Sequence, residues 1–121
     1  MANILIVDDD PRLLDALAWL VASEGHSVTR AKNGRDALAL AKANPPDIVI
    51  TDYMMPFMNG IELADALSAH PALGHIPVVL NSAVAEPPPG TRSIAAFIRK
   101  PFAASRLIEL VNDRVAEFSR A

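Results

Sequence analysis

Short runs of apolar residues recur along this chain and alternate with longer amphipathic stretches. The runs at residues 4–7, 47–51 and 76–80 are rich in isoleucine and valine, and polar or turn-forming residues follow them. Continuous apolar runs of this length are typical of strands that are buried on both faces of a sheet. Strands that alternate with helices predict an α/β fold in which helices cover both faces of a parallel sheet.

The pattern predicts five strands with helices between them. Asp10 followed by Pro11 is a helix start, because aspartate caps the first turn and proline fits the first helical position. Asn33 and Gly34 are expected to form a turn before the second helix, which two prolines end at residue 45. We expect strands at 4–7, 26–30, 47–51, 76–80 and 95–98, and helices from 11 to about 25, around 37–43, at 61–69 and after residue 101.

The composition restricts the possible functions of the chain. Its 121 residues, 51% of them hydrophobic, predict one domain with its own core, spanning residues 1–121. The chain has no cysteine, which excludes disulfides, zinc–thiolate sites and a catalytic thiol. A net charge of −3 disfavours direct nucleic-acid binding. No apolar run approaches the ~20 residues of a membrane span, and the first residues lack a basic signal segment, so we expect a cytoplasmic protein.

One stretch departs from the alternation. Between the fourth and fifth expected strands, where a covering helix belongs, the chain carries Pro87, Pro88, Pro89 and Gly90. Prolines and glycine are strongly disfavoured inside a helix. The helix at this place is therefore predicted to be shortened or replaced by a proline-rich loop.

Polar side chains follow four of the expected strands. In open α/β sheets, ligands bind beyond the carboxyl ends of the strands. We expect a five-stranded parallel sheet with the flavodoxin-like strand order 2-1-3-4-5. In this order strands one, three, four and five are neighbours, and their ends converge on one pocket. The residues at these ends are Asp8, Asp9 and Asp10; Asp52; Asn81 and Ser82; and Lys100.

These residue types together suit phosphoryl chemistry. Crowded carboxylates repel one another unless a cation neutralises them, and an oxygen-only site suits Mg²⁺. Asp52, on the central strand, is then a candidate nucleophile that forms an acyl phosphate. Lys100 would offset the charge of the incoming phosphoryl group, and Ser82 could donate a hydrogen bond to it.

The same residues carry a family resemblance. Nearly the whole chain resembles the receiver domain of two-component response regulators. The signature segments are residues 4–10, the Asp-Tyr-Met-Met-Pro-Phe-Met-Asn-Gly stretch at 52–60, Ser82-Ala83, and Lys100-Pro101-Phe102.

The resemblance implies a role for each matching residue. Asp52 matches the phosphoacceptor, and Asp8 and Asp9 match the acidic pair that holds Mg²⁺. The implied direct ligands of the ion are Asp9, Asp52 and the Met54 backbone carbonyl. Ser82 and Phe97 match the switch hydroxyl and the switch aromatic, and Lys100 matches the phosphate-binding lysine. The implied activity is a signalling switch rather than a turnover enzyme. The implied partners are a histidine kinase or phosphotransfer protein as phosphoryl donor, and a downstream protein that reads the switch.

Two alternatives remain at the level of sequence. The strand followed by Asp8 and Asp10 is similar to the opening of haloacid-dehalogenase-type phosphatases, in which the first aspartate is the nucleophile. Arg12, however, occupies a position where that motif has a small residue. The second alternative is a receiver-like interaction module whose output does not depend on phosphate.

Overall fold

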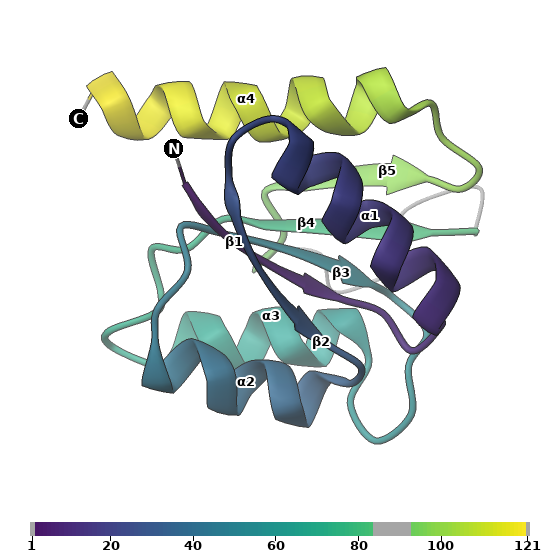
Figure 1. Ribbon diagram of the computed structural model, residues 1–121. Helices are drawn as coiled ribbons and strands as arrows, with labels where there is room; N and C mark the ends of the chain where they lie inside the picture. The colour runs from purple at the N-terminus through teal and green to yellow at the C-terminus, as the bar shows by residue number, and fades with distance from the viewer. Residues whose placement is uncertain (1, 84–92, 121) are drawn as a thin grey trace.

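A five-stranded parallel sheet forms the centre of the computed structural model, which describes residues 2–83 and 93–120 (Figure 1). The strand order is β2-β1-β3-β4-β5, and all four neighbouring pairs are parallel. The predicted flavodoxin-like order is therefore confirmed. The strands are β1 (Asn3–Val7), β2 (Ser27–Ala31), β3 (Ile48–Asp52), β4 (Val78–Ser82) and β5 (Ala96–Arg99).

Helices cover both faces of this sheet. Helices α1 (Pro11–Ser23) and α4 (Ala104–Arg120) lie on one face, and α2 (Gly34–Ala43) and α3 (Gly60–Ala69) lie on the other (Figure 1). Successive residues of a strand point to opposite faces, so each strand contributes to two cores. In β3, for example, Ile48 and Ile50 pack in the core beneath α1 and α4, whereas Val49 packs in the core beneath α2 and α3.

Side-chain caps fix where the first three helices begin. Asp10 accepts a hydrogen bond from the backbone N–H of Arg12 at 3.0 Å, as expected for the cap before Pro11. Asn33 accepts from the N–H of Asp36 at 2.7 Å, and Gly34 is already helical. The predicted turn at Asn33 and Gly34 is therefore wrong, because this asparagine caps a helix instead.

The loop between β3 and α3 ends in a reciprocal cap. Asn59 accepts from the N–H of Glu62 at 2.8 Å, and the Glu62 carboxylate accepts from the N–H of Asn59 at 3.0 Å. This capping box satisfies two backbone donors that the helix itself leaves unpaired. Helix α3 therefore begins at a defined point directly after the loop that leaves β3.

The connection between β4 and β5 is described only at its two ends. Ala83 follows β4, and residues 93–95 precede β5 without α-helix. The prediction of a shortened helix or proline-rich loop at residues 87–90 lies outside the described residues. Among the helices that the structure describes, none has the length and apolar character that crossing a bilayer requires.

Candidate acidic site at the carboxyl ends of the strands

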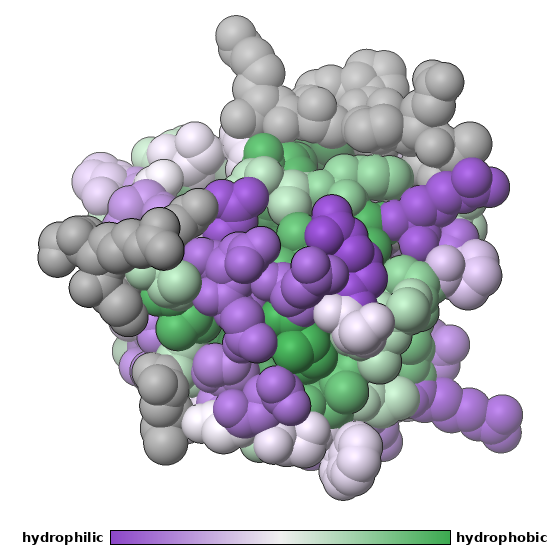
Figure 2. Space-filling view, turned by 90° about the horizontal axis from the view of Figure 1, so that it is seen from above, coloured by the Kyte–Doolittle hydropathy of each residue, from purple (hydrophilic) through white to green (hydrophobic). Residues whose placement is uncertain are grey.

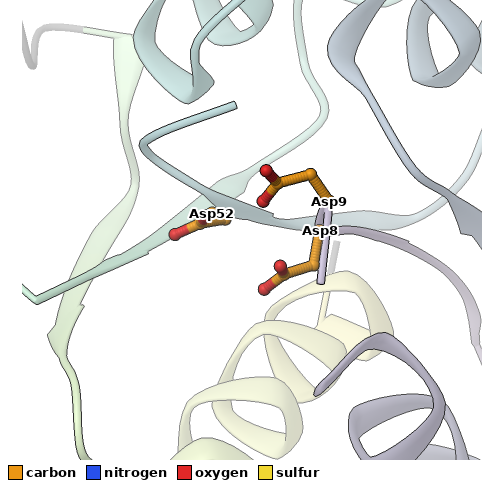
Figure 3. Close-up of side chains that lie close together, drawn as sticks. All are labelled: Asp8, Asp9 and Asp52. Atoms are coloured by element: carbon orange, nitrogen blue, oxygen red, sulfur yellow. The ribbon is translucent and has the colours of Figure 1, made fainter. Parts of the chain in front are cut away.

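Three carboxylates meet where β1 and β3 end. Asp8 and Asp9 follow β1, Asp52 is the last residue of β3, and each offers an oxygen within 4.8 Å of the others. Figure 3 shows the three side chains projecting to the same side. Asp8 is 1% exposed and Asp52 is 8% exposed, whereas Asp9 is exposed to solvent. The parallel register places these ends side by side, as the sequence predicted.

Lys100 reaches into this acidic cluster from the end of β5. Its Nζ lies 3.0 Å from Oδ1 of Asp52 and 3.6 Å from Oδ2 of Asp8. Its backbone N–H donates to the carbonyl of Ser82 at 2.7 Å, which ties the start of the following loop to β4. The peptide bond from Lys100 to Pro101 is cis. The ammonium thus partly neutralises two carboxylates that come from different strands.

Burial dominates the electrostatics of the cluster. Loss of hydration raises the pKa of Asp8 and of Asp52, and the neighbouring carboxylates raise both further. A hydrogen bond and the charge of Lys100 oppose the rise at Asp52, and the Asp10 N–H and Lys100 oppose it at Asp8. The pKa of both groups is still above its ordinary value. One ammonium is therefore insufficient to compensate the negative charge.

The residues fit a hard divalent cation. Oδ1 of Asp8 accepts from the N–H of Asp10 at 2.9 Å, but within the described part of the chain the buried Oδ2 has no hydrogen-bond partner. Carboxylate oxygens on one partly open side of the sheet are the ligands that Mg²⁺ takes in proteins. An oxygen without a hydrogen bond, and carboxylates whose pKa burial raises, both suit ligands of a cation.

Gly60 holds the chain close behind Asp52. Its N–H donates to the carbonyl of Tyr53 at 2.8 Å, which closes the loop that follows β3. A Cβ at this position would overlap the backbone carbonyl of Asp52 and lie 2.5 Å from Cδ1 of Leu80. Only glycine therefore lets the first turn of α3 approach the end of β3 this closely.

The other residues predicted for the site lie around it. Ser82 ends β4 and is buried, next to the buried Asn81. Met54 lies in the loop after Asp52 with its side chain 66% exposed. Phe97 is half-buried in β5, in register with Leu80 of β4. The structure thus brings Asp8, Asp9, Asp52 and Lys100 into one cluster. The chemical roles of these four residues, like those of Ser82, Met54 and Phe97, stay predictions.

Two features of the loop after β3 escaped the sequence prediction. Phe57 is 78% exposed and has a φ of +71°, a conformation that non-glycine residues rarely adopt. The guanidinium of Arg35, on α2, lies 5.9 Å from the centre of its ring. The loop also packs against α2, where a Cβ on Gly34 would lie 2.9 Å from Cβ of Met58. Backbone conformation and contacts of this kind leave no specific pattern in a single sequence.

The acidic cluster and fold match a family of known proteins. Residues 4–112 match the family model described as response regulator receiver domain. The chain is 40% identical over 80 residues to protein PilH of Pseudomonas aeruginosa, covering 66% of each protein. It is 29% identical to the polar-differentiation response regulator DivK of Brucella anthropi, covering 97% of that protein. It spans only 12% of the gliding motility regulatory protein of Myxococcus xanthus, to which it is 37% identical over 94 residues.

Solved structures show the same likeness. The signal receiver domain of a signal transduction histidine kinase from Syntrophus aciditrophicus superposes with a TM-score of 0.91 and 30% identity, covering 100% of this chain and 95% of that one. The chemotaxis response regulator CheY4 of Vibrio cholerae superposes with a TM-score of 0.84 and 26% identity, covering 94% of this chain and 98% of that one.

Proposed function

Because this chain belongs to the response regulator receiver domain family, we propose that it is a signalling switch in which Asp52 accepts a phosphoryl group. The observation that carries this proposal is the contact of Asp52 with Lys100 inside a cluster of three carboxylates. Asp52 is the carboxylate of the cluster that lies on the central strand β3 and has Lys100 at hydrogen-bond distance, 3.0 Å. It therefore combines a nucleophilic oxygen with a cation next to the place where the charge of the phosphoryl group arrives.

The transfer exchanges one bond to phosphorus for another. A carboxylate oxygen of Asp52 attacks the phosphorus of a phosphohistidine, the P–O bond forms, and the P–N bond breaks with its electron pair going to the imidazole nitrogen. The ammonium of Lys100 then pairs with a phosphoryl oxygen, because the acyl oxygen of Asp52 no longer carries full negative charge. Ser82, at the end of β4, donates its hydroxyl to another phosphoryl oxygen.

A divalent cation completes the charge balance of this site. Asp8, Asp9, Asp52 and the backbone carbonyl of Met54 would hold Mg²⁺. When bound, the ion supplies positive charge that offsets the phosphoryl oxygens. Asp8 would benefit from that charge, because its buried Oδ2 has only the ion pair with Lys100 at 3.6 Å among the described residues.

The output of the switch is a shift between two conformations. Contacts of Ser82 and Phe97 that form only after phosphorylation would favour the active conformation, which a downstream protein then binds. A histidine kinase or phosphotransfer protein is the donor. The phosphatase alternative needs Asp10 as an acid, but the Asp10 carboxylate instead caps α1 by accepting from the N–H of Arg12. The family match and this cap favour Asp52 over Asp8 as the nucleophile.

A small phosphodonor tests the proposal directly. We expect phosphoramidate with Mg²⁺ to add one phosphoryl group to the protein, and peptide mapping to place it on Asp52. Asp52→Asn should take up none, whereas the matched control Asp10→Asn should behave as wild type. A phosphoryl group found on Asp8 would overturn the proposal in favour of the phosphatase reading.

Beryllofluoride, which mimics the acyl phosphate, separates the switch from an interaction module that ignores phosphate. We expect it to bind with Mg²⁺ to the wild-type protein and not to Asp52→Asn, and to change the amide spectrum around Ser82 and Phe97. Binding without any spectral change beyond the acidic cluster would contradict the switch.

A further inference from the structure

Asn81 is a fully buried polar side chain whose amide makes no hydrogen bond within the described residues. It is 0% exposed, and neither its Nδ2 nor its Oδ1 has a hydrogen-bond partner among residues 2–83 and 93–120. A buried amide without partners costs free energy that an apolar side chain of the same size would not cost. Such a group calls for an explanation, and one explanation is a partner that is present only in another state of the protein.

The register of the sheet places Asn81 beside the proposed phosphoacceptor. Asn81 on β4 is the direct partner of Asp52 on β3. Val79 and Ile50, two residues earlier on these strands, share the core beneath α1 and α4. Because side chains alternate along a strand, Asn81 and Asp52 point to this same face. Neighbouring strands of a sheet lie roughly 4.8 Å apart, so these two side chains are close neighbours.

The other neighbours of Asn81 in the sheet limit which groups can form a hydrogen bond with its amide. On its other side the register partner is Ile98, and along its own strand the neighbour on the same face is Val79, both of which are apolar and buried. Lys100, which follows β5, reaches Asp52 on β3, and β4 lies between these two strands. Its side chain therefore crosses the end of β4. Among its described neighbours at this end of the sheet, Asp52 and Lys100 therefore supply the polar groups on the same face as the Asn81 amide.

In the unphosphorylated site, Lys100 donates a hydrogen bond to Asp52. Its Nζ lies 3.0 Å from Oδ1 of Asp52. Under the proposed function, on which this inference rests, Lys100 moves to the phosphoryl oxygens once Asp52 is phosphorylated. The oxygen of Asp52 that is not bonded to phosphorus is then a carbonyl oxygen. It no longer has Lys100 as a partner, and the Asn81 amide lies next to it.

We propose that Asn81 is an additional residue of the phosphoryl site. Its Nδ2 donates to the acyl oxygen of phosphorylated Asp52 that is not bonded to phosphorus, and this promotes release of the phosphoryl group. In hydrolysis, a water oxygen attacks phosphorus and the P–O bond to Asp52 breaks. The electron pair of that bond returns to Asp52, inorganic phosphate leaves, and the proton of the water passes to phosphate. Hydrogen bonds to a carboxylate are stronger than those to a neutral carbonyl, so the Asn81 bond strengthens as the bond to phosphorus breaks.

Removal of the donor tests this inference. Asn81→Leu keeps a similar volume without an N–H, and Asn81→Val is a smaller apolar variant in case leucine overpacks the site. Each is phosphorylated with phosphoramidate and Mg²⁺, the donor is removed, and loss of phosphate from Asp52 is followed at fixed pH. We expect the phosphorylated lifetime of the apolar variants to rise by roughly tenfold, the factor that corresponds to about 1.4 kcal/mol.

Two further measurements separate this role from a purely structural one. The apolar variants should resist urea better than wild type before phosphorylation, because they bury no unpartnered amide there. Asn81→Ser, which retains an O–H donor, should have a lifetime between that of wild type and that of Asn81→Leu. A lifetime within twofold of wild type in the folded apolar variants would overturn the inference. Failure of the wild-type protein to take phosphate on Asp52 would instead overturn the proposed function.

Discussion

Asp8 holds a negative charge at a place that water barely reaches. Its carboxylate is 1% exposed, and one of its oxygens has no hydrogen-bond partner. Loss of hydration raises its pKa above 3.8, so the folded protein binds this proton more tightly than the unfolded chain does. The contribution of Asp8 to stability therefore falls as the pH rises from 3.8 through its folded pKa, and the full penalty remains at neutral pH.

Asp8→Asn should therefore stabilise the metal-free protein at neutral pH. Asparagine keeps the oxygen that accepts from the N–H of Asp10, while Lys100 keeps Asp52 as its partner. We expect a gain of about 1 kcal/mol at pH 7, measured by urea unfolding with a chelator, and a gain that shrinks toward pH 4.

The matched control for this prediction is Asp10→Asn, because Asp10 is exposed and asparagine caps helices as well as aspartate does. It should leave stability unchanged at both pH values. A loss of stability at pH 7 in Asp8→Asn would contradict the view that burial controls the charge of Asp8.

At the scale of single residues, the sequence predicts chemistry better than it predicts partners. Asp8, Asp9, Asp52 and Lys100 were predicted to converge because strand ends of a parallel sheet share an edge, and they do. Asn81 was placed at this edge without a role, since nothing in the sequence shows that its amide is buried and unpartnered.

At the scale of elements, strands were easier to predict than the starts of helices. Every predicted strand is present, with ends that differ by at most two residues. For β1, β3 and β4 the hydrophobic runs mark burial directly, whereas β2 is mostly exposed. Asn33 and Gly34 were predicted wrongly because asparagine and glycine favour both turns and helix caps. Which of the two forms depends on the packing of α2 against the loop after β3, which only the folded chain shows.

The junction of β3 and α3 depends on Gly60. Gly60→Ala should destabilise the protein by roughly 1–3 kcal/mol, because the added Cβ would overlap the carbonyl of Asp52, a backbone atom that cannot easily give way. Displacing Asp52 should also slow its phosphorylation by phosphoramidate.

Gly25→Ala is the control for this junction, since Gly25 has a φ of +91° and no atom within 4 Å of its added Cβ. It should lose stability through backbone strain but be phosphorylated at the wild-type rate. Equal slowing in both variants would mean that global destabilisation, and not the position of Asp52, limits the reaction.

Helix α4 begins without the side-chain cap that α1, α2 and α3 have. The carbonyl of Ala103 accepts from the N–H of Leu107 at 3.4 Å, which makes Ala103 the cap residue, and alanine has no side-chain acceptor. Ala103→Asp should therefore stabilise the protein by about 1 kcal/mol in urea unfolding. Ser105→Asp, inside the first turn, is the matched control for added charge and should gain less. Equal gains would attribute the effect to charge near the helix end.

For the molecule as a whole, the acidic cluster and an apolar cavity lie on the same face of the sheet. The face beneath α1 and α4 carries the acidic cluster at its carboxyl end, and an apolar cavity of about 460 Å³ lies beside it. Leu13, Leu17 and Leu20 of α1 line this cavity together with Lys100, Pro101 and Phe102. Figure 2, which views the molecule from this side, shows apolar atoms exposed between polar side chains. At this edge of the sheet, the charges of Asp8, Asp9 and Asp52 are only partly offset by Lys100.

Stability of the whole molecule should therefore depend on a divalent cation. Binding to the folded state alone, at a Mg²⁺ concentration ten times the dissociation constant, adds about 1.4 kcal/mol, which corresponds to a rise of roughly 5 °C in Tm for a chain of this size. Asp52→Asn and Asp9→Asn should each lose most of this rise, because each removes a ligand charge. Asp8→Asn gives the most direct comparison. Without Mg²⁺ this variant should be more stable than wild type, and it should gain less stability from the ion. The free energies of unfolding of the two proteins should therefore converge as Mg²⁺ is added. Parallel gains in both proteins would show that the ion binds elsewhere, and that the buried charge of Asp8 is compensated by Lys100 alone.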